Sequence, residues 1–323
     1  KQINAAYRLA LTGTPIENSL SELWSIFDYL MPGYLYSYTR FRKQFEMPIM
    51  KNEDAAARNR LRKMTAPFLL RRSKSQVLSD LPEKDEKTIY SGMEDEQRKL
   101  YLAAHKQLVD QLQGIDSAYY EKNKIFILSQ LTKLRQICCH PALCYDDYQG
   151  SSAKLEACME LVQRAVKGKH KVLLFSQFTS MLDLIRERLA EQNTKYYCLT
   201  GNTDKQERQR LVDEFQNDDT PVFLISLKAG GTGLNLTAAD IVIHYDPWWN
   251  VAAQNQATDR AYRIGQEKPV TVYKLILKDT IEENLLKLQN AKLALAAQVV
   301  SEGMVSLGDL SQNELMELFE QNP

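Results

Sequence analysis

Short apolar runs alternate with amphipathic segments after residue 151, and this alternation restricts the fold more than any other feature of the sequence. The first amphipathic segment carries Leu155, Met159, Val162 and Val166 on one helical face and ends at Gly168. Such alternation predicts an α/β fold with a parallel sheet that helices cover on both faces. The expected strands are residues 171–176, 196–200, 222–226, 241–245 and 270–277, and the further expected helices are 181–191, 204–216 and 250–263.

The stretch from about residue 34 to residue 150 is different, because strand-like runs are scarce there and charged amphipathic segments dominate. A Pro-Gly pair at 32–33 opens this region, and a Gly-Ser-Ser run at 150–152 closes it. We interpret it as a helical insertion between two α/β pieces. Two expected helices have apolar positions at helical spacing: Leu100, Ala104, Leu108 and Leu112 in one, and Ile127, Leu131 and Leu134 in the other.

These patterns predict four parts of the chain. Residues 1–33 form the end of a first α/β lobe, in which residues 7–12 are a short strand. Residues 34–150 are the mainly helical insertion or linker, and residues 151–279 form a second lobe. A C-terminal bracing helix and tail follow over residues 280–323, with Glu282 and Glu283 near the helix start, as the helix dipole favours.

The composition excludes some functional classes. The sequence of 323 residues has 41 basic and 41 acidic side chains, which argues against a wholly basic nucleic-acid coat but permits a local basic groove. Its five cysteines are an odd count, which suits free thiols in a reducing compartment. The apolar runs are shorter than the ~18 residues that a membrane span needs, so we expect no membrane partner.

The segment QATDRAYRIGQ, residues 256–266, is the strongest chemical signal. On a continuous helix, Gln256, Arg260 and Arg263 would share one face, and both guanidinium groups could reach the same polyanion. Phosphoryl transfer uses such arginines, because negative charge spreads over the phosphoryl oxygens in the transition state. The alternative is a solvated helix face with two surface arginines.

Two further segments follow expected strands. In ISLKAGGTGLNL, residues 225–236, glycines allow backbone N–H groups to approach phosphate or ribose, although a purely conformational turn is the alternative. In DPWWN, residues 246–250, exposed tryptophans could lie against bases or sugars; alternatively, both pack in the core. Both segments follow strands, and open α/β sheets bind ligands at the carboxyl ends of strands.

The segment LALTGTPIEN, residues 9–18, is the fourth signal. The Thr12, Gly13 and Thr14 turn carries hydroxyl groups that could relay the nucleotide state to a bound nucleic acid through hydrogen bonds. The alternative is ordinary turn and N-cap chemistry, which Thr14 and Pro15 also suit.

Together these segments resemble the SWI/SNF-type ATPases of helicase superfamily two. The resemblance covers nearly the whole chain, and the order and spacing of the motifs make it specific. It implies a RecA-like lobe with a family-specific helical insertion, in the C-terminal half of a bacterial member. TGTPIEN is similar to motif III, VLLFSQF (172–178) to motif IV, YCLTG (197–201) to motif IVa, AGGTGLNL to motif V, QATDRAYRIGQ to motif VI, and LRQICCHP (134–141) to a marker segment of the family.

The resemblance also implies roles for individual residues. The catalytic arginine fingers would be Arg260 and Arg263, and the nucleotide contacts would be Gln256, Gly231, Gly233 and Asn235. The contacts to DNA would be Gln177, Thr200, Gly201, Lys228 and Trp249, while Thr12, Gly13 and Thr14 would couple the two sites.

The sequence contains no G-x-x-x-x-G-K-[ST] phosphate-binding loop and no acidic DExH box at a strand end. In the family both lie in the first RecA-like lobe, so we expect the chain to begin near the end of that lobe. ATP and Mg²⁺ would be held mainly by the first lobe, and these 323 residues alone would not hydrolyse ATP. The expected partners are double-stranded DNA, the first lobe and a protein roadblock such as a nucleosome or RNA polymerase, in the cytoplasm or nucleoid of a bacterium or in a eukaryotic nucleus.

Other interpretations remain open at this point. The same lobe could be a non-catalytic duplex-binding or protein-interaction platform, or part of an RNA helicase of the same superfamily. Cys138, Cys139, His140 and Cys144 form a dense group, but structural zinc sites usually pair Cys-x-x-Cys ligands with a distant second pair. We therefore expect no metal there, and the family resemblance assigns the segment to packing.

Overall fold

The computed structural model describes residues 5, 7–12, 20–52, 54–70, 81–112, 117–230, 234–287 and 289. They belong to two compact units. One comprises residues 1–79 and 288–309, and the other comprises residues 80–287 and 310–323.

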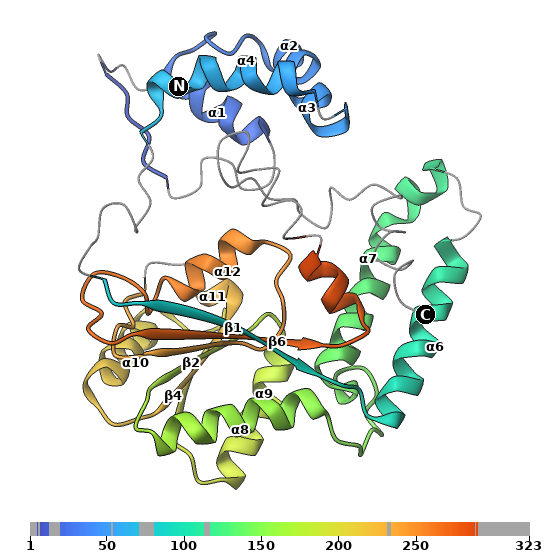
Figure 1. Cartoon of the computed structure of the whole chain (residues 1–323), viewed down its shortest axis with the longest axis vertical. Helices are drawn as coiled ribbons and strands as arrows, with labels where there is room; N and C mark the ends of the chain where they lie inside the picture. The colour runs from blue at the N-terminus through green and yellow to red at the C-terminus, as the bar shows by residue number, and fades with distance from the viewer. Residues whose placement is uncertain are drawn as a thin grey trace. The chain divides into compact units, whose positions relative to one another are not determined.

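The second unit is built on a parallel sheet whose strands run in the order β1-β6-β5-β2-β4-β3 (Figure 1). Every residue of β2 and β4 is buried, and Leu174 lies opposite Leu224 on one side and Ile243 on the other. The predicted parallel α/β fold is therefore confirmed. The strands are β1 (Lys84–Ser91), β2 (Val172–Ser176), β3 (Tyr196–Leu199), β4 (Val222–Ser226), β5 (Ile241–His244) and β6 (Val270–Leu277).

Helices cover both faces of this sheet because successive strand residues point to opposite sides. Leu174 packs among apolar residues of α8 (Ala153–Lys167) and α9 (Thr179–Glu191). Leu173 and Phe175 pack on the other face, with residues of α10 (Lys205–Asn217) and α12 (Val251–Thr258). Figure 1 shows α8 and α9 on one side of the sheet and α11 (Leu227–Gly230) and α12 on the other.

Strand β1 is a feature that the sequence analysis missed. Its sequence, KDEKTIYS, is mostly exposed, yet it pairs with β6 along its whole length, from Lys84 opposite Val270 to Ser91 opposite Leu277. Charged residues suit an edge strand, because they discourage pairing with another chain. Partial burial opposes ionisation of Glu86, but hydrogen bonds from Lys274 and Lys84 outweigh it and lower the pKa of Glu86 to about 2.

Because β1 belongs to the sheet, the helical region expected over residues 34–150 is divided between the two units. Helices α6 (Asp95–Leu112) and α7 (Ser117–Cys139) and the 3₁₀ turn η3 (Pro141–Leu143) belong to the second unit. Ile127, Leu131 and Leu134 of α7 are buried, as their spacing predicts. The structure thus divides the chain near residue 80 rather than at residue 33 or 150.

Residues 281–287, after β6, are helical, and Ile281 and Leu285 are buried. They begin the segment 280–323, which was predicted to form a bracing helix and a tail. The rest of that segment lies outside the described residues, apart from residue 289.

The first unit is a small helical core. Leu23, Phe27, Phe41, Phe45 and Leu61 are fully buried in it. Its elements are α1 (Leu20–Leu30), α2 (Tyr38–Phe41), the π-helical turn η1 (Arg42–Glu46), α3 (Met47–Asn52), α4 (Ala55–Thr65) and the 3₁₀ turn η2 (Ala66–Phe68).

The strand predicted over residues 7–12 is wrong. These residues have no regular secondary structure, and Leu9 and Leu11 are 79% and 90% exposed. A strand needs a neighbouring strand for its backbone hydrogen bonds, and the described part of the chain offers none to this segment. Among the described helices, none is both long and apolar enough to cross a bilayer.

Candidate functional site

The carboxyl edge of the sheet gathers the residues predicted to contact DNA. All strands are parallel, and β5, β2, β4 and β3 are successive neighbours, so the loops that follow them stand in that order along one edge. Trp249 follows β5, Gln177 follows β2, Lys228 lies in α11 after β4, and Thr200 and Gly201 follow β3. This is the edge at which open α/β sheets bind ligands.

These positions differ in exposure. Gly201 is exposed, and an added Cβ there would meet no atom within 4 Å, while Thr200 and Gln177 are half-buried. Trp248 and Trp249 are both half-buried, so neither lies entirely in the core. Trp248 packs against the core of the α10–α12 face, whereas the Trp249 ring has the Arg135 guanidinium carbon 5.2 Å from its centroid. The side chain of Lys228 is not among the described parts of the structure.

Helix α12, which leads into the segment with Arg260 and Arg263, is shorter than predicted. It begins after Asn250, whose side chain accepts a hydrogen bond from Ala253 N at 2.9 Å, and it ends at Thr258. The prediction that Gln256, Arg260 and Arg263 share one face of a helix over 250–263 is therefore wrong. Beyond Thr258 the regular helical pattern gives way to a mixture of two-, three- and four-residue backbone hydrogen bonds, and Arg260 O accepts a 3.0 Å bond from Leu236 N.

This bond joins the segment that follows the glycine-rich sequence to the arginine segment. Arg263 Nη1 also donates to Leu234 O at 3.2 Å, and the exposed Asn235 lies between these two contacts. Burial lowers the pKa of Arg260, and the positive charge of Arg263 lowers it further, so the two guanidinium groups are close enough to repel. Two partly buried cations beside an exposed amide provide a site that a polyanion would stabilise.

The remaining predicted site residues are only partly described. Gln256 is half-buried on α12, and Thr12 lies in the irregular segment of the first unit. Gly231, Gly233, Gly13 and Thr14 lie outside the described residues.

Comparisons with known proteins identify the fold family. Residues 1–143 match the SNF2-related domain, and residues 153–265 match the helicase conserved C-terminal domain. The solved C-terminal domain of the Sulfolobus solfataricus SWI2/SNF2 ATPase is 34% identical, with a TM-score of 0.60, over 75% of this chain and 100% of that one. The chain belongs to the SWI2/SNF2 family of ATPases.

Two further members of the family show how much of such a protein the chain represents. The Sulfolobus solfataricus SWI2/SNF2 ATPase core, solved in complex with dsDNA, is 39% identical over 97% of this chain and 67% of that one, with a TM-score of 0.62. The putative ATP-dependent helicase/translocase YwqA of Bacillus subtilis is 43% identical over 99% of this chain and 35% of its own length. The chain thus spans about a third of that relative. The second unit corresponds to the C-terminal RecA-like lobe of the family.

Gln266, at the end of the SWI2/SNF2 motif VI, is a structural residue that sequence reasoning counted as part of the functional signal. It is buried, and its Nε2 lies 2.8, 3.0 and 3.1 Å from the carbonyl oxygens of Ala239, Thr237 and Ala261. Its Oε1 accepts from Lys268 N at 2.9 Å. Gln266 therefore fixes the turn that ends the motif, while Gly265 beside it supplies a φ of 96°, which glycine adopts without strain.

A buried polar cluster beneath the same edge of the SWI2/SNF2 lobe was not predicted. Asp246 is 1% exposed and accepts hydrogen bonds from Ser176 Oγ at 2.5 Å and from Gln177 N at 3.3 Å. Burial raises the pKa of Asp246 despite the Arg135 guanidinium, whose Nη2 lies 4.0 Å from Asp246 Oδ2. Burial likewise lowers the pKa of Arg135, although Asp246 opposes that shift.

A second buried ion pair lies close to this cluster. Lys154 Nζ lies 2.7 Å from both carboxylate oxygens of Glu282, and the two side chains are 0% and 1% exposed. Burial alone would lower the pKa of Lys154, but Glu282 outweighs it and raises that pKa. Because Glu282 also accepts from Leu277 N at 2.9 Å, the pair fixes the start of α8 to the end of β6 and the helix after it.

The cysteine-rich segment of the marker motif is packed. Cys138 and Cys139 are fully buried, and burial raises the pKa of both thiols. The carbonyl of Cys139 accepts hydrogen bonds from Ser152 Oγ at 3.1 Å and Tyr245 OH at 2.9 Å. His140 Nδ1 accepts from Ala142 N. Within the described ranges, no three or more His, Cys, Asp or Glu residues are grouped so as to hold a metal ion.

His244 of β5 contacts the end of α12, and its burial leads us to expect that stability depends on pH. It is buried, stacks on Phe175 with ring centroids 5.6 Å apart, and its Nε2 lies 2.9 Å from Thr258 Oγ1. Burial lowers the pKa of His244 to about 3. Below a pH of about 6.5, His244 is therefore protonated in the unfolded chain but not in the folded chain. The free energy of unfolding consequently falls as the pH falls through that value.

We expect unfolding free energies to show this difference. Between pH 7 and pH 5 the wild type should lose about 2 kcal/mol more stability than the His244→Gln variant, in which this titration is absent. Urea denaturation at both pH values measures the two losses, and all other titrating groups are common to both proteins. Equal losses would show that His244 gains its proton in the folded state.

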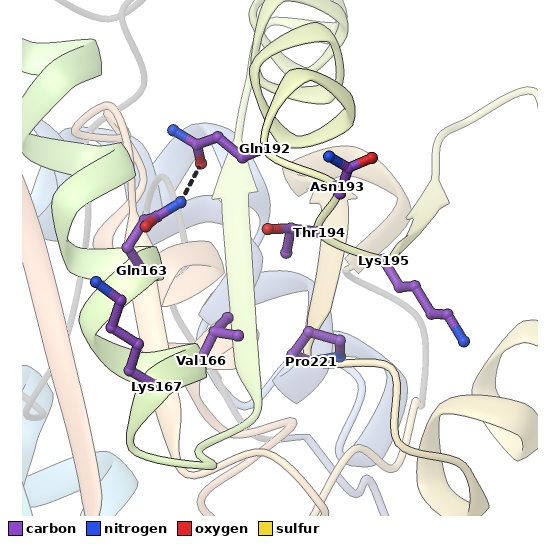
Figure 2. Close-up of a pocket in the computed structure, with 8 residues that line it drawn as sticks. All are labelled: Gln163, Val166, Lys167, Gln192, Asn193, Thr194, Lys195 and Pro221. Atoms are coloured by element: carbon purple, nitrogen blue, oxygen red, sulfur yellow. Dashed lines mark hydrogen bonds between the residues drawn. The ribbon is translucent and has the colours of Figure 1, made fainter.

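An open pocket of about 450 Å³ lies at the opposite, amino-terminal edge of the sheet (Figure 2). Lys195 precedes β3 and Pro221 precedes β4, while a 2.7 Å hydrogen bond joins Gln163 of α8 to Gln192 after α9. The pocket thus lies away from the loops that carry the family motifs.

Proposed function

We propose that this chain supplies the second lobe of an ATP-driven motor that translocates on double-stranded DNA. The observation that carries the proposal is the junction of motifs V and VI, where Arg260 and Arg263 meet the segment around Asn235. Their mutual repulsion in a partly buried place is relieved by a polyanion. We assign Arg260 and Arg263 as arginine fingers toward the phosphates of ATP bound between two lobes.

The nucleotide would be held mainly by another part of the motor. Arg260, Arg263 and Asn235 fit the phosphate side of ATP, since they offer two cations and an amide. None of the described acidic side chains is grouped to hold Mg²⁺. The sequence also lacks a phosphate-binding loop. We therefore propose a first RecA-like lobe as the partner that binds Mg²⁺ and the β- and γ-phosphates, with Gln256, Gly231 and Gly233 completing the nucleotide site, and with Thr12, Gly13 and Thr14 coupling it to DNA.

The duplex would lie along the carboxyl edge of the sheet. Gln177, Thr200, Gly201, Lys228 and Trp249 follow four neighbouring strands, which suits a continuous phosphate backbone. Contacts to phosphate do not depend on base sequence and weaken as salt rises. The Sulfolobus solfataricus SWI2/SNF2 ATPase core, which was solved in complex with dsDNA, supports double-stranded DNA as the ligand. A protein obstacle on the duplex is the proposed target of the motor.

Hydrolysis assays test the proposal. In the complete protein that carries this chain, duplex DNA of any sequence should stimulate ATP hydrolysis severalfold, and structured RNA should not. The stimulation should weaken as salt rises, because phosphate contacts release counterions. The 323-residue chain alone is the control and should hydrolyse ATP at background rate.

Each alternative has its own outcome in these assays. Absence of hydrolysis in the complete protein would favour a non-catalytic binding platform. Stronger stimulation by RNA than by duplex DNA would favour an RNA helicase.

A further inference from the structure

Arg135, in the marker segment of α7, contacts both of the central loops at the carboxyl edge of the sheet. Its Nη1 donates to Gln177 Oε1 at 3.0 Å, in the loop after β2. Its Nη2 donates to Pro247 O at 2.5 Å, in the loop after β5. Because β2 and β5 are neighbours in the sheet, one guanidinium group fixes two adjacent loops from outside the sheet.

The same side chain orders the aromatic residues of those loops. The Arg135 guanidinium carbon lies 5.2 Å from the centroid of the Trp249 ring and 5.8 Å from that of Phe178. The side chain is only 4% exposed, so these contacts are shielded from water and the planar fork is held in one orientation. Lysine, a point charge without a planar fork, would not make both loop contacts in this way.

A purely structural role does not account for the hydrogen bonding of this cluster. Arg135 Nε, Gln177 Nε2 and Trp249 Nε1 are buried and have no hydrogen-bond partner among the described residues. A buried unpaired donor destabilises a fold, and a complete buried ion pair can often be replaced by apolar residues without loss of stability. All three unpaired groups are donors, which is the complement of an acceptor-rich phosphate backbone.

We propose that Arg135 is a positioning residue that holds Gln177 and Trp249 in the arrangement that binds the DNA backbone. The proposal rests on the proposed function of this edge as a DNA site. It gives α7 a task beyond packing, because the helix presets two loops that lie 42 and 112 residues further along the chain. Arg135 acts through these loops, and its own contact with DNA is not required.

The test is a titration of DNA-stimulated hydrolysis in the complete protein. For the Arg135→Met variant we expect the half-saturating concentration of duplex DNA to rise about tenfold or more, because a buried charge-assisted contact is lost. The rate at saturating DNA should stay within about threefold, since the nucleotide site is untouched. Arg135→Lys should be intermediate, because it keeps the charge but not the fork.

Two controls separate positioning from general damage. Arg188→Met removes an ion-paired arginine from the far end of α9 and should leave half-saturation unchanged. In a double-mutant cycle, adding Gln177→Ala to Arg135→Met should weaken DNA binding less than the two single effects combined, because both act through the same loop.

Several results would overturn the proposal. They are a wild-type half-saturation in folded Arg135→Met, a lower saturated rate with unchanged half-saturation, or full additivity with Gln177→Ala. If Arg135→Met melts below the assay temperature, Arg135→Lys decides alone: wild-type half-saturation in that variant rejects the role. Absence of DNA stimulation in the wild type would instead reject the proposed function of the edge.

Discussion

Replacing Arg260 or Arg263 with alanine in the complete ATPase is expected to lower turnover roughly 10³-fold or more, the scale of an arginine finger. Each guanidinium stabilises charge that develops only in the transition state, so the rate constant at saturating ATP should fall more than the affinity for nucleotide. Steady-state hydrolysis with saturating duplex DNA measures this. The affinity for DNA without nucleotide should change little, because these two side chains are assigned to the phosphates of ATP and not to the duplex.

Controls distinguish this role from loss of folding. Arg263→Ala also removes the hydrogen bond to Leu234 O, so thermal melting must show that each variant is folded at the assay temperature. Lysine should restore little activity, because an ammonium group lacks the planar fork. Arg210→Ala, on the exposed face of α10, should leave turnover near normal. Near-normal turnover in both folded Arg260 and Arg263 variants would reject the finger assignment.

Replacing Lys154 with methionine is expected to destabilise the second unit by about 3–5 kcal/mol, because it leaves the Glu282 carboxylate buried without its cation. Loss of this pair also releases the start of α8 from the end of β6. Urea denaturation of the wild type and the variant at pH 7 measures the difference.

The double variant Lys154→Met/Glu282→Gln is the matched control. It removes the charge and keeps an oxygen for Leu277 N, so most of the lost stability should return. A single variant within about 1 kcal/mol of the wild type would show that the pair contributes little net stability.

The sequence indicates buried regular elements well and exposed or irregular ones poorly. Strands β2 and β4 were predictable, because both of their faces are covered and each forms a continuous apolar run. Strand β1 was missed because its charged residues at the sheet edge show no apolar alternation. The helix predicted over 250–263 ends early because tertiary hydrogen bonds of Arg260 O and Gln266 outweigh the local periodicity.

For the candidate site, the sequence indicates where the motif residues lie but not the buried polar contacts that hold them. The motif positions could be placed at strand ends, and their order along the edge follows from the strand order. The Arg135 and Lys154 contacts could not be predicted, because their partners lie 42 to 128 residues away and charged side chains are ordinarily exposed. One local signal existed: Lys154 lies one helical turn before the buried Cys158, on the apolar face of α8.

The pairing of β1 with β6 has a consequence for synthesis on the ribosome. Glu86 and Lys274, which pair across these strands, are 188 positions apart, so at a synthesis rate of ~5–20 residues per second β1 waits roughly 10–40 s for its partner. A strand without a partner can pair with other nascent chains. The run of four charged residues at its start, Lys-Asp-Glu-Lys, opposes such pairing during that interval. The residues that made β1 hard to predict therefore also protect it from aggregation until the sheet closes.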